Sequence, residues 1–229
     1  MSYAVGHSLP FAQGVFHVKH YPEDEAVTAY LRQYSRRHAL DVPAERLDRI
    51  ASLVSWLAPA SHRLGLTKYA DPMAMSEQLV APALLLLAPS LSPHVSSPML
   101  DFGAGSGAVG LSLATAMPAS EIVLADRRRR VVQFLDLAVH RHDLGNCRSL
   151  VVDLADMTAG LESDFGTILV RAFGPVDQAL ISAQAWLKPG GVVALWHRPG
   201  ACFTPDGLTA LRTEETELPS LVLTLYQRV

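Results

Sequence analysis

The stretch that decides the fold is residues 98–110, which read Pro-Met-Leu-Asp-Phe-Gly-Ala-Gly-Ser-Gly-Ala-Val-Gly. A short apolar run at 99–102 leads into closely spaced glycines and then into a helical pattern. Glycine lets a backbone approach a ligand and take conformations closed to other residues. In open α/β sheets ligands bind in the crevice beyond the ends of the strands. We therefore predict a ligand-binding turn built on Gly103, Gly105 and Gly107.

The chain beyond this stretch keeps alternating short apolar runs with helical patterns, which is typical of a mostly parallel sheet. Right-handed crossovers then give a doubly wound, Rossmann-like α/β fold. We predict strands at 99–102, 121–125, 149–152, 167–170, 191–196 and 221–228, and helices between them at 108–116, 128–141 and 176–187.

The residues before the sheet are predicted to be helical. Residues 1–20 show no clear period and are expected to be an arm. A first helix is expected to begin at Pro22, a second to span 43–57 and a third to span 72–87. A polar loop is expected between the last two, at 59–71. The predicted organisation is an arm at 1–20, a helical segment at 21–97 and a cofactor-binding α/β domain at 98–229.

Composition narrows the class of protein. Of 229 residues, 49% are hydrophobic and 18% are charged, which predicts a packed core and not a disordered chain. Cys147 and Cys202 form neither a disulfide framework nor a zinc-ligand spacing, so no metal is expected. The strongest apolar run, 79–88, is too short to span a membrane, and the first ten residues lack a targeting pattern. We expect a cytoplasmic protein.

The glycine spacing leaves the cofactor open, because Gly105-x-Gly-x-x-Gly110 also fits the dinucleotide fingerprint. Asp101 favours S-adenosylmethionine, since a carboxylate at this position, usually apolar in dinucleotide folds, suits the ammonium of the amino-acid half. Asp126 ends the second strand, where either cofactor presents its ribose hydroxyls. We predict a class I methyltransferase that uses S-adenosylmethionine, with an oxidoreductase as a distant alternative. Asp153 and Asp156 follow the third strand and face either the adenine or solvent.

The sequence resembles the glucose-inhibited division protein B family, the bacterial small-subunit (16S) ribosomal RNA guanine-N7 methyltransferases. The resemblance runs from about Leu53 to Trp196. Its most specific motif is Arg171-Ala-Phe173 after the fourth strand. The other anchors are Trp56, Leu66-Thr67, Asp71-Pro72, the segment Leu100 to Gly107, Asp126, Arg130 and Phe134-Leu135.

The resemblance implies residue roles. It places Gly103, Ala108, Ala155, Asp156 and Arg171 at the cofactor. It also places Arg130 near the substrate, where the family has a lysine, so a fork-shaped guanidinium replaces a point charge. Arg130 belongs to the run Arg127 to Arg130, which contacts phosphate or forms a solvated helix face.

The substrate side departs from the family pattern. Gly65 stands for an asparagine, and Trp196-His-Arg-Pro-Gly200 replaces a Lys-Gly pair. The family's arginine before the last strand has no clear counterpart. His197 and Arg198 follow the fifth strand at the cleft side and are candidate substrate residues.

Three functions remain open. Guanine N7 already has a lone pair, so its methylation needs positioning and exclusion of water more than a strong base, and no catalytic residue is assigned. The net charge of −3 is low for a protein that grips RNA by charge alone, although a local basic patch can suffice. The alternatives to ribosomal RNA methylation are methylation of a small molecule in a biosynthetic pathway and a non-catalytic binding module.

Overall fold

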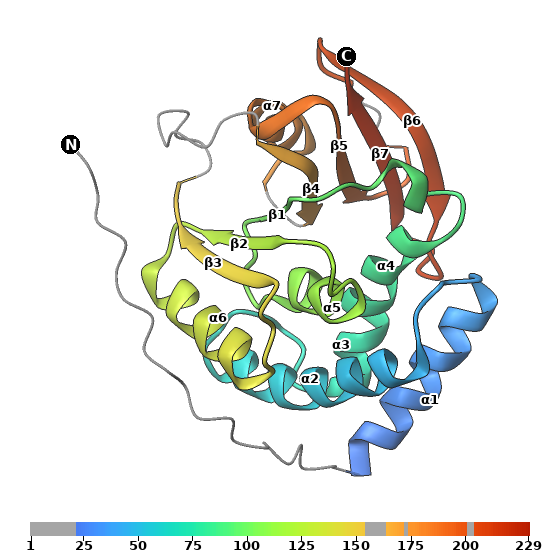
Figure 1. The fold of residues 1–229 in the computed structure, drawn as a ribbon, viewed down its shortest axis with the longest axis vertical. Coiled ribbons are helices and arrows are strands. Elements are labelled where there is room, and N and C mark those ends of the chain that lie inside the picture. The colour runs from blue at the N-terminus through green and yellow to red at the C-terminus, as the bar shows by residue number, and fades with distance from the viewer. Residues whose placement is uncertain (1–21, 154–163, 172–173, 201–203) are drawn as a thin grey trace.

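A single seven-stranded sheet organises the protein (Figure 1). The computed structural model describes residues 22–153, 164–171, 174–200 and 204–229. The strand order is β3-β2-β1-β4-β5-β7-β6. The strands are β1 (Met99–Phe102), β2 (Ile122–Asp126), β3 (Cys147–Val151), β4 (Phe165–Arg171), β5 (Leu187–His197), β6 (Leu208–Glu215) and β7 (Val222–Arg228).

Helices cover both faces of this sheet. The long ones are α1 (Pro22–Arg37), α2 (Ala44–Arg63), α5 (Ala108–Ala116), α6 (Arg129–Arg141) and α7 (Val176–Trp186). Short ones lie between α2 and β1, namely α3 (Pro72–Met75), the π-helix η1 (Ser76–Val80), α4 (Ala81–Leu84) and the 3₁₀ turns η2 (Leu85–Leu87) and η3 (Ser92–His94).

The doubly wound prediction is confirmed. Strands β3, β2, β1, β4 and β5 pair in parallel, and β7 then runs antiparallel to β5. Strand β6, which pairs antiparallel with β7, is not among the predicted strands. Its residues are mostly exposed and Leu208 is the buried one, so the strand lacks the apolar alternation by which a sequence reveals a half-buried strand.

Two helical predictions need correction. Helix α2 continues through Pro59 to Arg63, where a loop is predicted from residue 59 onward. The predicted helix 72–87 is broken into α, π, α and 3₁₀ turns. Pro82 contributes to the break because it has no N–H to donate to the carbonyl of Gln78, four residues earlier. That carbonyl is then free for another donor.

Separate hydrophobic cores lie on the two faces of the sheet. Residues of α1, α2 and α4–α6 pack with one face, from which Met99 and Leu124 project. Residues of α7 pack with the other face, from which Leu100 and Phe102 project. In Figure 1, α2, α5 and α6 accordingly lie below the strands and α7 above them. No described helix is long and apolar enough to cross a membrane.

The first described helix is also tied to the last hairpin. Glu217, in the turn between β6 and β7, accepts hydrogen bonds from Arg37 Nε and Nη2, both at 2.8 Å, and lies 3.0 Å from His38 Nε2. This ion pair joins residues 180 positions apart in the chain.

Candidate functional site

The strand register brings three predicted site residues into one row. Phe102 of β1 pairs with Ala125 of β2 and with Val170 of β4. The residues that follow them, Gly103, Asp126 and Arg171, therefore end neighbouring strands at the carboxyl edge of the sheet. This edge is where open α/β folds bind their ligands.

The glycine turn adopts the backbone that its sequence predicts. Gly103, Gly105 and Gly107 have φ of +78°, +54° and +79°, a region in which other residues are strained. A Cβ on Gly107 would also lie 2.6 Å from a side-chain carbon of Leu135. Helix α5 can therefore begin close against α6, with Ala108 in its first turn only 2% exposed.

Asp126 is almost enclosed at the end of β2. It is 4% exposed, and Oδ2 accepts a hydrogen bond from the Gly105 N–H at 3.2 Å. Arg128 donates to it three times, from its backbone N–H at 2.9 Å and from Nε and Nη2 at 3.0 Å each. Burial raises the pKa of Asp126, but the bonds from Arg128 and Gly105 outweigh burial and lower it overall. A carboxylate accepts about four hydrogen bonds, so an incoming hydroxyl has to replace a guanidinium contact.

Asp101 faces the helix beneath the turn. It is 4% exposed, and Oδ2 accepts a hydrogen bond at 2.9 Å from the N–H of Gly110 in the first turn of α5. Burial raises its pKa to about 7, against the opposing effect of the Gly110 bond. The predicted contact with the cofactor's ammonium stays a prediction, while the observed bond fixes the start of α5.

Arg171 links the sheet to the helices that precede it. Its Nη2 donates to the backbone carbonyl of Gln78, the one that Pro82 leaves without a helical donor. Its Nη1 is buried and has no hydrogen-bond partner within the described part of the chain. Burial lowers the pKa of Arg171 to about 10, and nearby Tyr69 opposes this shift. The side chain is thus a buried cation at neutral pH with one unmatched donor.

Of the predicted substrate residues, His197 lies at the same sheet edge, one residue beyond Trp196, which pairs with Arg171. Arg130 is exposed on the first turn of α6, and Arg198 is exposed beyond β5. The ring of His197 is held by Thr224 Oγ1, 2.9 Å from Nε2, and by the Arg198 carbonyl oxygen, 2.9 Å from Nδ1. Both contacts fix His197 to its own sheet edge.

Ala155 and Asp156, predicted at the cofactor, lie outside the described residues. Two contributors are absent from the residues predicted for the site. Arg128 stands two positions after Asp126, a spacing that permits the observed fork. Gln78 contributes a backbone oxygen, and the signal for it was Pro82, four residues later.

The sheet order, the glycine turn and the acidic end of β2 fit a class I S-adenosylmethionine-dependent methyltransferase, and the family match decides for this class over a dinucleotide enzyme. The chain belongs to the GidB family, described as rRNA small subunit methyltransferase G, which matches residues 46–197.

Curated relatives carry the same description. "Ribosomal RNA small subunit methyltransferase G" of Synechococcus elongatus is 29% identical over 188 residues, covering 78% of this chain and 76% of the relative. The protein of that name from an Anaeromyxobacter species is 30% identical over 196 residues, covering 79% and 86%.

A solved structure supports the fold alone. TrmN from Thermus thermophilus aligns with a TM-score of 0.51 at 19% identity, covering 64% of this chain and 49% of TrmN.

Proposed function

We propose that this protein transfers a methyl group from S-adenosylmethionine to N7 of a guanine in 16S ribosomal RNA. The observation that carries the methyl-transfer part is the row of Gly103, Asp126 and Arg171 at one sheet edge. The ribosomal substrate is supported by the name that the curated relatives carry. The N7 position is what the family resemblance implies. Such a substrate also favours a cytoplasmic location.

The cofactor contacts follow from the chemistry of the row. Asp126 would accept the ribose hydroxyls in place of the Arg128 fork. Arg171 would use its unmatched Nη1 for the carboxylate of the amino-acid half, because a buried donor without a partner is costly. Gly103, Gly105 and Gly107, with Ala108, let the ligand approach the backbone.

Asp101 holds the first turn of α5 from below and is thus a positioning residue. Its carboxyl lies two residues before Gly103, and a contact with the cofactor's ammonium is proposed as the alternative to this positioning role, to be decided by the cofactor affinity of Asp101→Asn. Ala155 and Asp156 are retained as candidates for the adenine side.

The protein's task in this reaction is positioning. The bound cofactor supplies an electrophilic methyl group. Guanine N7 attacks with an existing lone pair, so no side chain has to remove a proton. Arg171 remains protonated at neutral pH and holds one end of the site rigidly, since it is buried and anchored to Gln78. Arg130, His197 and Arg198 are proposed to contact the RNA, and Arg130 and Arg198 are exposed enough to do so.

The test is methyl transfer from labelled cofactor to purified small ribosomal subunits and, separately, to a small-molecule extract. We expect label in 16S RNA, at a guanine located by mass mapping. Arg171→Met should abolish most of it while its melting temperature stays within a few degrees of the wild type. Label confined to small molecules would replace the RNA assignment. Cofactor binding without transfer to any fraction would indicate a binding module.

A further inference from the structure

A pocket of about 410 Å³ lies at the opposite edge of the sheet from the cofactor row. Its walls come from the start of α2, the end of α5 and the turn between α6 and β3. Asn146 in that turn precedes β3, and its carbonyl accepts a hydrogen bond from the Ile122 N–H at the start of β2. The pocket thus sits at the amino ends of β2 and β3, whereas Asp126 lies at the carboxyl end.

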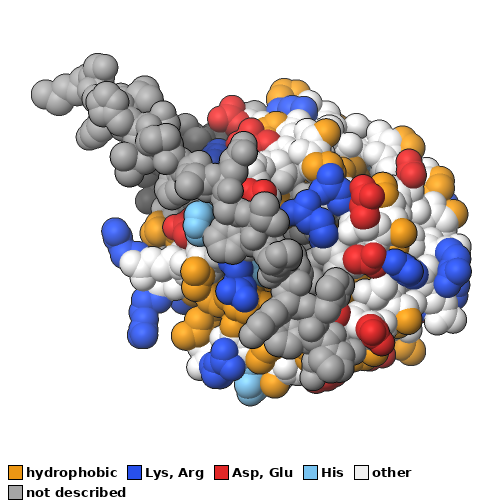
Figure 2. All heavy atoms as spheres, turned by 60° about the horizontal axis from the view of Figure 1, so that its bottom comes forward, with side chains coloured by type: hydrophobic (Ala, Val, Ile, Leu, Met, Phe, Trp, Pro, Cys, Tyr) orange, Lys and Arg blue, Asp and Glu red, His pale blue; other side chains and the backbone are white. Residues whose placement is uncertain are grey.

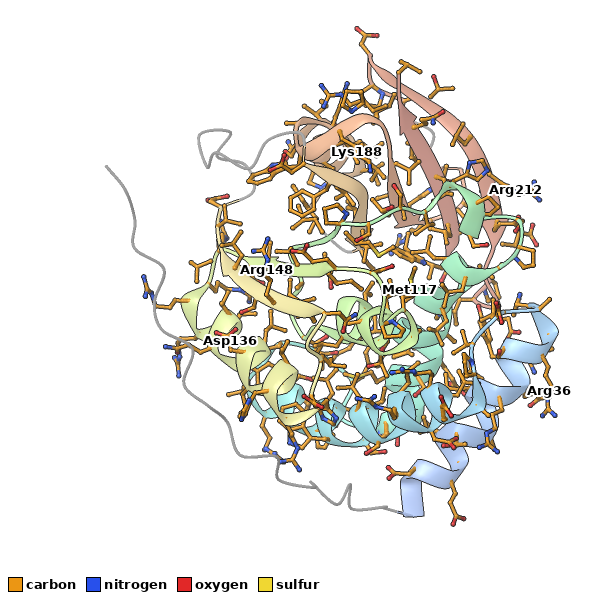
Figure 3. The ribbon with its side chains drawn as sticks, in the orientation of Figure 1. Arg36, Met117, Asp136, Arg148, Lys188 and Arg212 are labelled. Carbon is orange, nitrogen blue, oxygen red and sulfur yellow. The ribbon has the colours of Figure 1, made fainter. Side chains whose placement is uncertain are left out.

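The floor of this pocket is well ordered by polar bonds. The side-chain amide of Asn146 donates to the carbonyls of Ala114, Met117 and Ser120 at 3.0, 3.1 and 3.0 Å. Figure 3 labels Met117, which follows the last residue of α5 and marks this end of the helix. The helix end and the turn before β3 are therefore fixed to each other, and the pocket is part of the fold.

Two arginines of α2 line it, and a third lies near the end of α6. Arg46 and Arg49 of α2 line the pocket and are neighbours three residues apart on one helix face. Arg49 donates to the carbonyl of His142 at 3.0 Å, which places it over the end of α6. Arg141, at that end, holds its guanidinium 5.3 Å above the ring of Trp56. Arg46 and Arg49 lie one helical turn apart, and like charges at this spacing disfavour each other unless an anion binds between them.

The acidic complement is small. Among the lining residues, Asp143 carries the opposing charge. The neighbouring ring of His142 is kept neutral, since burial, Arg141 and Arg49 lower its pKa to about 4. Among the lining residues two arginines thus face one acidic side chain, in a chain whose net charge is −3. Figure 2 shows lysine and arginine side chains on the forward face, interspersed with aspartate and glutamate.

We propose that Arg46 and Arg49, in the pocket whose floor the Asn146 bonds hold in place, bind backbone phosphates of the RNA substrate at a distance from the methylated base. Guanidinium groups match phosphate by paired hydrogen bonds, and the size of the pocket suits a phosphate with its sugar. This inference rests on the proposed RNA substrate. Such a pocket would provide a local basic contact in an acidic chain. It would hold a large RNA while one base is methylated at the cofactor edge.

The test compares two double variants of equal charge. Arg46→Gln with Arg49→Gln removes the pocket's cations. Arg36→Gln with Arg63→Gln is the control, since both are exposed, and Figure 3 shows Arg36 on α1 at the side of the molecule. Binding of 16S RNA is measured by filter retention from 50 to 300 mM salt. Calorimetry with S-adenosylmethionine is run on the same samples.

We expect the pocket variant to weaken RNA binding about tenfold relative to the control and to lower the salt slope by about 1.5, as two lost phosphate contacts predict. Cofactor affinity should be unchanged, and methyl transfer to small subunits should recover at high RNA concentration.

Equal RNA affinity and slope in both double variants would overturn the inference while leaving the proposed function intact. If the wild type binds cofactor but neither binds nor methylates RNA, the proposed substrate itself fails. A third outcome concerns inorganic phosphate and ATP. If either anion stabilises the control but not the pocket variant, while RNA binding is the same in both, the pocket binds a small anion instead of RNA.

Discussion

Asp101 and Asp126 lie near the carboxyl ends of neighbouring strands, and each is 4% exposed, yet their surroundings have opposite effects on them. The Asp126 carboxylate receives four hydrogen bonds, three of them from an arginine, and its pKa is lowered. Asp101 receives the Gly110 bond, and burial raises its pKa to about 7. Similar exposure thus gives a fixed charge at the rim and a titrating group beneath the turn. Asp101 is the more deeply desolvated of the two, and it has fewer donors around it than Asp126.

The largest expected effect is on the pH dependence of stability. The folded protein keeps a proton on Asp101 that the unfolded chain releases, so its contribution to stability is complete below about pH 4 and is lost as pH rises to about 7. Asp101→Asn keeps an acceptor for Gly110 but cannot ionise. Its free energy of unfolding, relative to wild type, should rise between pH 4 and pH 8 by on the order of 3 kcal/mol.

Urea denaturation of both proteins at pH 4, 5.5 and 8 measures that difference. Asp126→Asn is the matched control, and it should behave in the reverse sense. The charge of Asp126 stabilises the fold above the unfolded pKa, so the deficit of this variant should shrink as pH falls below about 4. Parallel curves for Asp101→Asn and wild type would remove the distinction between the two carboxyl groups.

The next effect is on packing under the turn. A Cβ on Gly110 would lie 2.8 Å from Asp101 Oδ2 and would also collide with Leu124. Gly110→Ala should cost about 2 kcal/mol of stability after allowing for the better helix propensity of alanine. Gly105→Ala, with φ of +54° and an ordinary 3.8 Å contact between the added Cβ and the Gly103 carbonyl oxygen, should cost about 1 kcal/mol. Thermal melting of the two variants tests this order, and a larger loss for Gly105→Ala would reverse it.

A third effect concerns cofactor affinity at the rim. Asp126→Asn removes the charge proposed to accept the ribose hydroxyls. We expect its dissociation constant for S-adenosylmethionine to rise about 10- to 30-fold, the range for a lost charged hydrogen bond. Asp101→Asn at the same pH should change it by less than about threefold, because that group acts through α5. Calorimetry on both variants decides, and equal losses would mean that Asp101 also contacts the ligand.

The smallest effect runs in the favourable direction. Arg128 has to leave Asp126 for the ribose to bind, and its side chain is 54% exposed, so the competing ion pair is weak. Arg128→Ala should tighten cofactor binding about two- to fivefold and make it less dependent on salt. Arg129 carries the same charge as Arg128 but is not one of the donors to Asp126. Arg129→Ala is therefore the control and should leave the affinity for the cofactor unchanged. Weaker binding in Arg128→Ala would show that the arginine helps hold the carboxylate in place.

The sequence predicted what depends on local periodicity and on residue type. Five parallel strands, the glycine turn and the acidic end of β2 follow from short apolar runs and their spacing. Strand β6 could not be predicted from the sequence because its side chains are mostly exposed and show no apolar alternation. A polar loop is predicted from Pro59 onward, but α2 continues past the proline because its buried face, including Leu57 and Ser61, packs on both sides of it.

The site was predictable as a set of strand ends but not as a set of contacts. Asp101 alternates onto the face that α5 covers, and only the tertiary packing brings the Gly110 N–H within 2.9 Å of it. Arg171 was identified from its family motif, while its partner Gln78 lies 93 residues earlier in a helix that a proline distorts. A contact across that distance leaves no trace in a local pattern.

The ion pair of Arg37 and Glu217 has a consequence for the synthesis of the protein on the ribosome. These residues are 180 positions apart, so at about 5–20 residues per second α1 leaves the ribosome roughly ten to forty seconds before its partner is made. During this interval, the helices that precede the sheet expose the apolar side chains that the finished sheet covers. Chaperones that shield apolar surface on nascent chains would meet this protein from its first helix onward, and the last hairpin would end their access.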